Sequence, residues 1–218
     1  MSNFFEKKQP SVSLFLAIVF FFTFSLILQS CEDEVAITPK PRGFPRVVYP
    51  EKTYQAFEQG YCDFSFEYPK YAKIEKSNSF FDQRPSNECW FDISIPHFNA
   101  KIHFTYSPID NEETGEKLKA DAFELAHKHN IKAKYIEEIS IDTKNGAKGI
   151  AFNLEGEVAS PFQFFVSDEE KHFVRGSLYF NTEVAPDSLA PIFSFVKKDI
   201  EHMINTLKWK GKIGRAHV

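Results

Sequence analysis

Large apolar and polar residues alternate along several short runs of this chain, and this alternation most constrains what the chain can fold into. Phe64, Phe66 and Tyr68 alternate with Ser65 and Glu67. Successive side chains of a β-strand point to opposite faces, so a period of two predicts strands with one face in a core. The 25 Phe of the chain supply large side chains for that core. The predicted strands cover residues 63–68, 90–95, 101–106, 135–143, 147–155, 162–167 and 172–180.

The short segments between these runs predict antiparallel pairing. Pro96 follows the run 90–95, and a short loop leads into the run 101–106. Asn145-Gly146 lies between the fourth and fifth runs and is typical of a type I′ hairpin turn. The polar segment 168–171 separates the last two runs in the same way. We therefore expect consecutive strands to form hairpins.

Two segments change to a helical period. From Glu116 to about His129, one stripe carries Leu118, Ala122, Leu125 and Ala126. Near the end of the chain, Pro191 fits only the first turn of a helix. The second stripe consists of Leu189, Ile192, Phe193, Val196, Ile200, Ile204 and Leu207. Strands and helices together predict an α+β fold, with a largely antiparallel sheet and helices packed on it.

The N-terminal segment predicts export. Lys7 and Lys8 precede an apolar run, 14–28, which is shorter than the roughly 20 residues of a membrane-spanning helix. Residues 28–31 (LQSC) are similar to the bacterial lipobox, so we interpret residues 1–30 as a lipoprotein signal peptide and Cys31 as the lipidated residue, carrying acyl chains such as palmitate. An uncleaved signal anchor with an incidental cysteine is the alternative.

The segment that follows predicts a tether and then one domain. Residues 31–46 are polar and contain three prolines, which favours an extended linker. We expect a single globular domain over residues 47–211. The last residues, 212–218 (KIGRAHV), match an in-frame translation of a common sequencing-library adapter, and we interpret them as an artefact. A genuine basic tail is the alternative.

The other two cysteines predict a disulfide. With Cys31 lipidated, Cys62 and Cys89 remain as a pair in an oxidising compartment. A bridge between them would stabilise the domain by roughly 3 to 4 kcal/mol. We expect it to hold the strand that starts at Asp63 beside the one that starts at Trp90. Two buried free thiols are the alternative.

Charge and motifs exclude several classes of function. A net charge of −4 offers no basic field, so no nucleic-acid partner is expected. The nine Gly form no phosphate-binding loop, and Gly176-Ser177 lacks the second glycine of a nucleophile elbow. His127 and His129 lie on different sides of a helix and cannot share a metal ion. We predict no catalytic, metal or cofactor site.

The last predicted hairpin is large and apolar on both sides. One side carries Phe165, Phe173, Arg175 and Tyr179, and the other carries residues such as Phe164. If that first side is exposed, its aromatic and arginine content suits a protein-binding surface. The alternative is that helices cover both sides, as in a three-layer sandwich.

Several blocks of the chain together resemble the gliding-motility lipoprotein GldD family. The resemblance spans roughly Pro41 to Lys210 and is most specific from Gln163 to Phe180. The strand order is also, more distantly, similar to the PsbP/Mog1-like α/β/α sandwich. The other blocks are 46–50 (RVVYP), 54–57, Cys62 with 64–66, Cys89 with 93–96, 100–106, 186–189 and 207–210.

The resemblance implies a noncatalytic, membrane-anchored component of the gliding machinery that is linked to type IX protein secretion. Its expected partners are other gliding-motility and secretion lipoproteins and envelope proteins, with the membrane reached through the lipid anchor. It implies a place in the cell envelope, at the outer membrane or the periplasmic face, and no small-molecule ligand. The rival hypothesis is a periplasmic solute-binding protein or hydrolase, which should contain a pocket of several hundred cubic ångströms.

Overall fold

The computed structural model describes residues 16, 19–21, 46–76 and 85–210. The chain divides into two units, Met1–Gly43 and Phe44–Val218. The predicted lipidation site Cys31, the predicted tether up to residue 45 and residues 212–218 lie outside the described residues. None of the helices among the described residues has the length and apolar character needed to cross a membrane.

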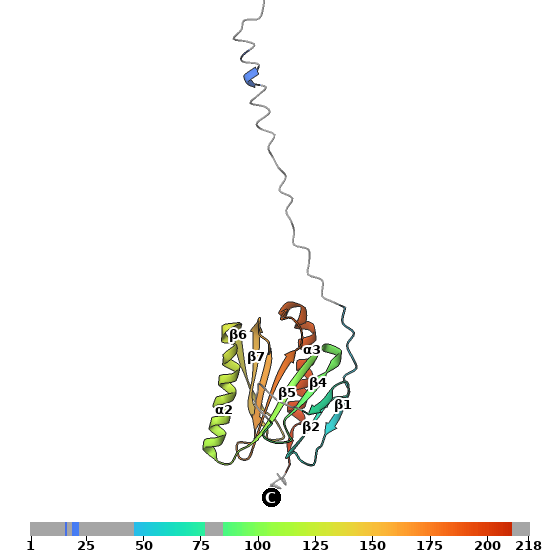
Figure 1. Cartoon of the computed structure of the whole chain (residues 1–218), viewed down its shortest axis with the longest axis vertical. Coiled ribbons are helices and arrows are strands. Elements are labelled where there is room, and N and C mark those ends of the chain that lie inside the picture. Colours follow the sequence, from blue (N-terminus) through green and yellow to red (C-terminus); the bar gives the residue numbers. More distant parts are fainter. Residues whose placement is uncertain (1–15, 17–18, 22–45, 77–84, 211–218) are drawn as a thin grey trace, which may run out of the picture. The chain divides into compact units, whose positions relative to one another are not determined.

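Seven strands form the main sheet of the second unit, in the order β3-β4-β5-β9-β8-β7-β6 (Figure 1). Every neighbouring pair among these strands is antiparallel. The predicted fold class, α+β with a largely antiparallel sheet, is therefore confirmed. The strands are β3 (Lys73–Lys76), β4 (Phe91–Ile95), β5 (Ala100–Pro108), β6 (Ala133–Asp142), β7 (Lys148–Gly156), β8 (Phe162–Ser167) and β9 (His172–Phe180).

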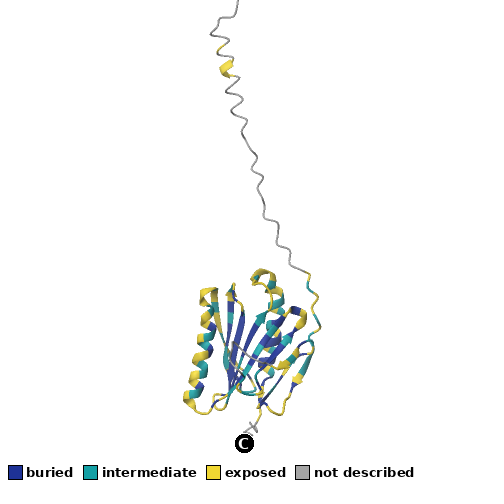
Figure 2. Ribbon diagram, viewed as in Figure 1, coloured by how far each residue is buried: buried dark blue, intermediate teal, exposed yellow. Residues whose placement is uncertain are grey.

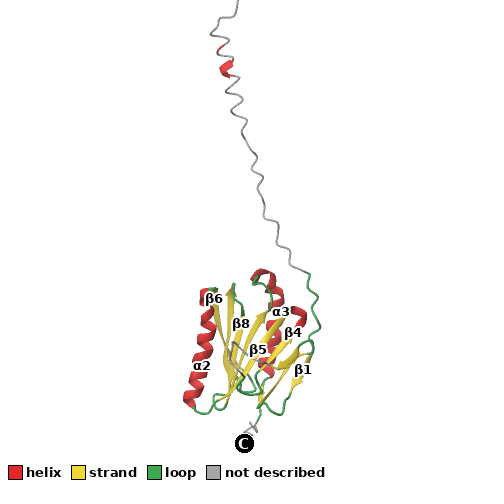
Figure 3. Cartoon of the chain, viewed as in Figure 1, coloured by secondary structure: helices red, strands yellow, loops and turns green. Residues whose placement is uncertain are grey.

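The helix α2 (Glu112–His127) connects β5, inside the sheet, to β6 at its edge, and a short 3-10 helix, η2 (Lys128–Ile131), follows it (Figure 3). It begins four residues before the predicted start. Asn111 caps it, because its side-chain oxygen accepts a hydrogen bond from the Thr114 amide at 2.9 Å. The capping residue, rather than the apolar stripe, sets where this helix starts.

A second, smaller sheet has the order β1-β2-β10, with strands Tyr54–Phe57, Phe64–Pro69 and Lys208–Trp209. Two of these strands and β3 were not predicted, because runs of two to four residues are too short to show alternation. The long helix α3 (Pro186–Thr206) packs beside β2. It begins earlier than predicted, so Pro191 lies beyond its first turn, on the exposed side, where water can hydrate the backbone carbonyl that loses its partner.

The two faces of the seven-stranded sheet belong to different cores. On one face, α3 and the small sheet cover the aromatic residues of β4, β5, β8 and β9. On the other face, α2 covers apolar residues of β7, β8 and β9. The buried residues of Figure 2 follow the strands through the middle of the domain. Gly176 is needed in the first core, because a Cβ there would come within 2.2 Å of the Phe164 ring.

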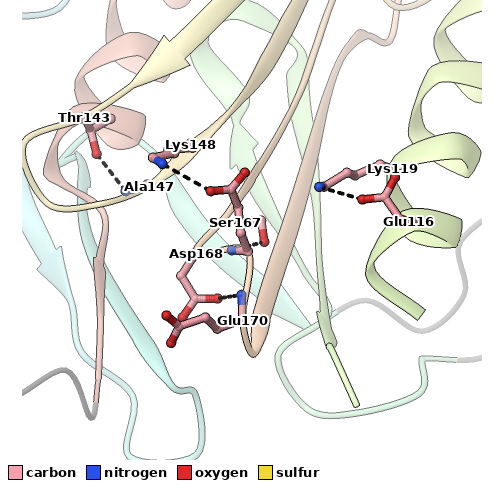
Figure 4. Close-up of polar contacts among 9 residues, drawn as sticks. Glu116, Lys119, Thr143, Ala147, Lys148, Ser167, Asp168 and Glu170 are labelled. Carbon is pink, nitrogen blue, oxygen red and sulfur yellow. Dashed lines mark hydrogen bonds and ion pairs between the residues drawn. The ribbon is translucent and has the colours of Figure 1, made fainter. Parts of the chain in front are cut away.

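The two hairpin turns at one end of the sheet are held by side chains (Figure 4). In the β6–β7 turn only Gly146 has a positive φ, at 79°, so this is not the predicted type I′ turn, which needs two such residues. The Thr143 hydroxyl instead accepts the Ala147 amide at 3.0 Å. In the β8–β9 turn, Asp168 accepts three backbone amides at 2.8 to 3.1 Å. These bonds, after the burial that opposes them, leave the pKa of Asp168 below its ordinary value.

A disulfide joins Cys62 and Cys89, whose Cα atoms lie 5.7 Å apart, within the usual range for a bridge. We expected the bridge to hold the two strands that follow the cysteines side by side. These strands belong to different sheets. β2 belongs to the small sheet and β4 to the large one. The two sheets instead face each other, and the rings of Phe66 and Phe91 lie 6.3 Å apart in the core between them. The bridge therefore ties two layers together.

Candidate functional site

The structure corrects the prediction of an exposed aromatic face on the β8–β9 hairpin. Phe165 and Phe173 are each 4% exposed and pack under α2, in one core cluster with Ala122 and Ala126. The physical reason is the apolar stripe of α2, which must be buried against an apolar partner. These two rings provide that partner, so they belong to the core and not to a surface.

Arg175 and Tyr179 lie further along the same face, on its polar part. The strand register pairs Arg175 with Thr105 and Tyr179 with Lys101 across β9 and β5, and pairs Asp92 with His103 across β4 and β5. Because alternate residues share a face, all of these side chains lie on the α2 side of the sheet. We call this group the polar strip; it consists of Asp92, Lys101, His103, Thr105, Arg175 and Tyr179.

An ion-pair cluster forms one end of the polar strip. The Asp92 carboxylate, 8% exposed, lies 2.6 Å from His103 Nδ1 and 3.1 Å from Lys101 Nζ. Burial alone would raise the pKa of Asp92, but the hydrogen bonds and charges of His103 and Lys101 outweigh it and hold that pKa below its ordinary value. This pair was not predicted from the sequence. The predicted runs put Asp92 and His103 on neighbouring strands but did not fix the register that sets them opposite each other.

Ser177 continues the row, because the register pairs it with His103. Serine, histidine and aspartate on three adjacent strands resemble a catalytic triad in order only. A triad requires the serine hydroxyl to be hydrogen-bonded to the imidazole and open to substrate. Ser177 is 1% exposed, and its hydroxyl has no hydrogen-bond partner within the described residues. This geometry provides no activated nucleophile.

A cavity of about 690 Å³ lies between α2 and the part of the polar strip formed by Thr105, Arg175 and Tyr179. Its size falls in the range of small-ligand sites, about 300 to 1,000 Å³. Leu118, Leu125 and Phe173 give it apolar walls, and Arg175 and Tyr179 give it polar groups. The remaining lining residues are Trp90, Thr105, Ser107, Asp121, Ala122, Lys128, His129 and Ala159. The rival hypothesis of the sequence analysis required a cavity of this size.

Arg175 is a half-buried cation in this lining. Its Nη2 donates a hydrogen bond to Gln163 Oε1 at 2.8 Å, and among the described residues it forms no ion pair with a carboxylate. Burial lowers its pKa, which stays far above neutrality for any guanidinium, so the group keeps its charge. Gln163 is neutral and 2% exposed, so it fixes the position of the guanidinium without neutralising it.

The positive charge of Arg175 affects the pKa values of two neighbouring residues. The pKa of His129 is lowered, first by its burial and then by the charge of Arg175. Burial raises the pKa of Tyr179, while the charge of Arg175 opposes that rise. His129 and Tyr179 therefore both remain uncharged near neutral pH. The inner lining of the cavity carries one fixed positive charge.

A second polar cluster lies on the opposite side of the domain, under α3. Asp199 is 1% exposed and accepts hydrogen bonds from Lys52 Nζ at 2.6 Å, from the Tyr54 hydroxyl at 2.8 Å and from the Tyr71 hydroxyl. Burial, together with these bonds, raises the pKa of both tyrosines. Every partner is satisfied within the protein. The cluster therefore fastens α3 to the segment around β1.

Within the described residues, no group of three or more histidine, cysteine, aspartate or glutamate side chains could hold a metal ion.

The comparison with protein families gives the decisive observation. The family described as "Gliding motility lipoprotein GldD" matches residues 34–209, most of the chain. The chain belongs to this family. The match starts three residues after Cys31 and includes the polar strip and the residues that line the cavity.

Other comparisons add little to the family assignment. No curated protein matches this chain. Among solved structures, the chain is similar to the solution structure of cyanobacterial PsbP (CyanoP) from Synechocystis sp. PCC 6803. The sequence identity is 11%, the TM-score is 0.44, and the alignment covers 73% of this chain and 94% of that one.

Proposed function

We propose that this GldD-family chain is a lipid-anchored, noncatalytic component of the gliding machinery, linked to type IX protein secretion. The observation that supports this best is the family match over residues 34–209, which covers nearly all of the chain after the cysteine of the lipobox-like segment. The name of the family contains both gliding motility and lipoprotein. The link to type IX secretion rests on the resemblance alone.

The anchor in this proposal is Cys31. Acyl chains on that cysteine would hold the domain at a membrane of the cell envelope, at the outer membrane or the periplasmic face. The Cys62–Cys89 disulfide is compatible with that oxidising compartment. Mass spectrometry of the mature N-terminus tests the anchor, and an unmodified Cys31 would contradict it.

The noncatalytic part of the proposal is supported by the chemistry of the polar strip. Asp92 and His103 form a pair that could move protons, but the hydroxyl aligned with them, on Ser177, is buried. We expect the folded domain to work through contacts with other gliding and secretion lipoproteins and envelope proteins. With Phe165 and Phe173 in the core, no particular surface is assigned to those contacts.

The experiment is a gene deletion in a gliding bacterium that carries this chain, complemented with the wild type or with Cys31→Ala at matched protein levels. We expect the deletion to stop spreading on agar, the wild type to restore it, and Cys31→Ala to fail. The amount of type IX cargo in the medium is measured in the same strains. Normal spreading of the deletion strain would remove the gliding role, and normal secretion would remove only the secretion link.

One observation favours a second candidate, a periplasmic solute-binding protein: the cavity beside Arg175. The same deletion separates the two functions. If the chain were a solute-binding protein outside the gliding machinery, the deletion strain would still spread normally. The purified protein would nevertheless bind a solute. A hydrolase is not favoured by any observation among the described residues.

A further inference from the structure

The cavity between α2 and the polar strip has the composition of a site for a small amphiphilic molecule. Most of its wall is apolar, from Leu118 and Leu125 on α2 and Phe173 on β9. Apolar walls with a small number of placed polar groups are typical of small-molecule sites, because burial supplies affinity and the polar groups set orientation. The ligand class is therefore decided by the polar groups.

Arg175 is the polar group that determines the class of ligand. A guanidinium carries five N–H donors, of which the bond to Gln163 uses one. A partly buried cation without a carboxylate in direct contact is costly, and an anion that pairs with it removes part of that cost. His129 lies in the same lining, and the charge of Arg175 adds to the burial that lowers the pKa of this histidine. The site complements an anionic group.

The number of charges distinguishes between anions. Lys128, the first residue of η2 and also in the lining, pairs with Glu124 of α2 at 3.0 Å, and the exposed Asp121 adds a negative charge to the lining. A phosphate would bring close to two charges to a single unpaired arginine and would be repelled by Asp121. A carboxylate brings one charge and matches the fork of a guanidinium with two parallel hydrogen bonds.

We propose that this cavity binds a small organic acid, with its single carboxylate on Arg175 and its apolar body between Leu118, Leu125 and Phe173. Gln163 is a positioning residue that holds the guanidinium toward the ligand. Tyr179 is a second polar residue of the lining. This binding is independent of the gliding role and goes beyond it.

The test is isothermal titration of the full chain, held in lipid nanodiscs, with 3-phenylpropionate, with empty nanodiscs as the blank. We expect saturable binding at one site, and at least tenfold weaker binding of 3-phenylpropionamide, which has the same shape without the charge. Arg175→Gln should lose at least tenfold in affinity for the acid and should no longer distinguish acid from amide. Arg46→Gln, at an exposed arginine outside the cavity, is the matched control and should bind as the wild type does.

A second variant keeps the test valid if Arg175→Gln unfolds. Leu125→Trp fills the cavity from a half-buried helix position and leaves Arg175 in place, so it should abolish binding while the thermal midpoint stays nearly unchanged. The proposal is overturned if the acid gives no heat above the blank, if the amide binds as well as the acid, or if Leu125→Trp still binds. It is also overturned if a peptide with a free C-terminal carboxylate binds and the small acid does not, since the occupant would then be a protein terminus.

Discussion

The two faces of the seven-stranded sheet are built from the same strands but are specified by different physics. On the α3 side, β5 presents Ile102 and Phe104, which are each 1% exposed and packed among aromatic rings. On the α2 side, the same strand presents Lys101, His103 and Thr105, all half-buried. Tight packing of large apolar side chains stabilises the first face, and charged and polar side chains line the second. A face defined by charge and only partly packed is where a ligand site can form.

The largest expected loss of stability is on the packed face, the one toward α3. Phe104 contacts the rings of Phe64, Phe66 and Phe91 at centroid distances of 4.8 to 5.6 Å. Phe104→Ala should destabilise the domain by about 3 to 5 kcal/mol, because a cavity remains among rings that cannot close it. The free energy of unfolding is measured in urea with the oxidised protein. Thr105→Ala, next in sequence but on the polar strip, should cost less than about 1 kcal/mol, and an equal loss in both variants would contradict the comparison.

The disulfide gives the next effect. It ties the small sheet to the large one over a separation of 27 residues. Cys62→Ala with Cys89→Ala should lower the free energy of unfolding by about 3 kcal/mol, since the unfolded chain gains the freedom of an open loop. The urea midpoint of the double variant should equal that of the reduced wild type. A midpoint unchanged from that of the oxidised wild type would show that the bridge does not stabilise the contact between sheets.

These large effects concern the part of the molecule that could be predicted from the sequence. The alternation of residues such as Phe64 and Phe66 predicts strands, and the stripe with Leu118 and Ala122 predicts α2, because each pattern is local. The three short strands escaped, since they pair only after the domain has assembled. The predicted start of α3 was wrong because we placed Pro191 in the first turn, where a proline is best tolerated. The helix begins at Pro186, so Pro191 lies inside it.

The candidate site could be predicted only in part, for a similar reason. The sequence placed Arg175 and Tyr179 together on one side of β9, and the structure keeps them together. It could not say how far α2 extends across the sheet, and that extent decides that Phe165 is core while Arg175 lines a cavity. The Asp92–His103 pair needed the register of the β4–β5 hairpin, which the turn at Pro96 left unspecified.

A third effect concerns Asp199, the charged group inside the packed side. Asp199→Ala removes the acceptor of Lys52, Tyr54 and Tyr71 and should cost about 1.5 to 3 kcal/mol, the range for hydrogen bonds to a charged group. Asp199→Asn keeps an oxygen for the tyrosines and should lose less. Thermal unfolding of both variants checks the order. A smaller loss for alanine than for asparagine would show that the cluster is not what fastens α3.

The smallest expected effect lies on the polar strip and sharpens the contrast through pH. The pKa of Asp92 is held below its ordinary value in the folded protein, against its burial, by His103 and Lys101. In the unfolded chain its pKa is about 3.9. A lowered folded pKa means that the ionised carboxylate stabilises the fold above the unfolded value, and that this stabilisation disappears as pH falls through the folded value. Asp92→Asn should therefore be less stable than the wild type by about 1 kcal/mol at pH 6.

The difference between Asp92→Asn and the wild type should shrink below about pH 4, as the wild-type carboxylate takes up its proton. Urea unfolding at pH 6, 4 and 3 measures this, with Asp121→Asn as the matched control, because Asp121 is exposed and belongs to no described ion pair. That control should show no pH-dependent difference. A gap between Asp92→Asn and the wild type that stays constant down to pH 3 would mean that the aspartate contributes through shape alone, and the polar strip would then be specified by packing, as the opposite face is.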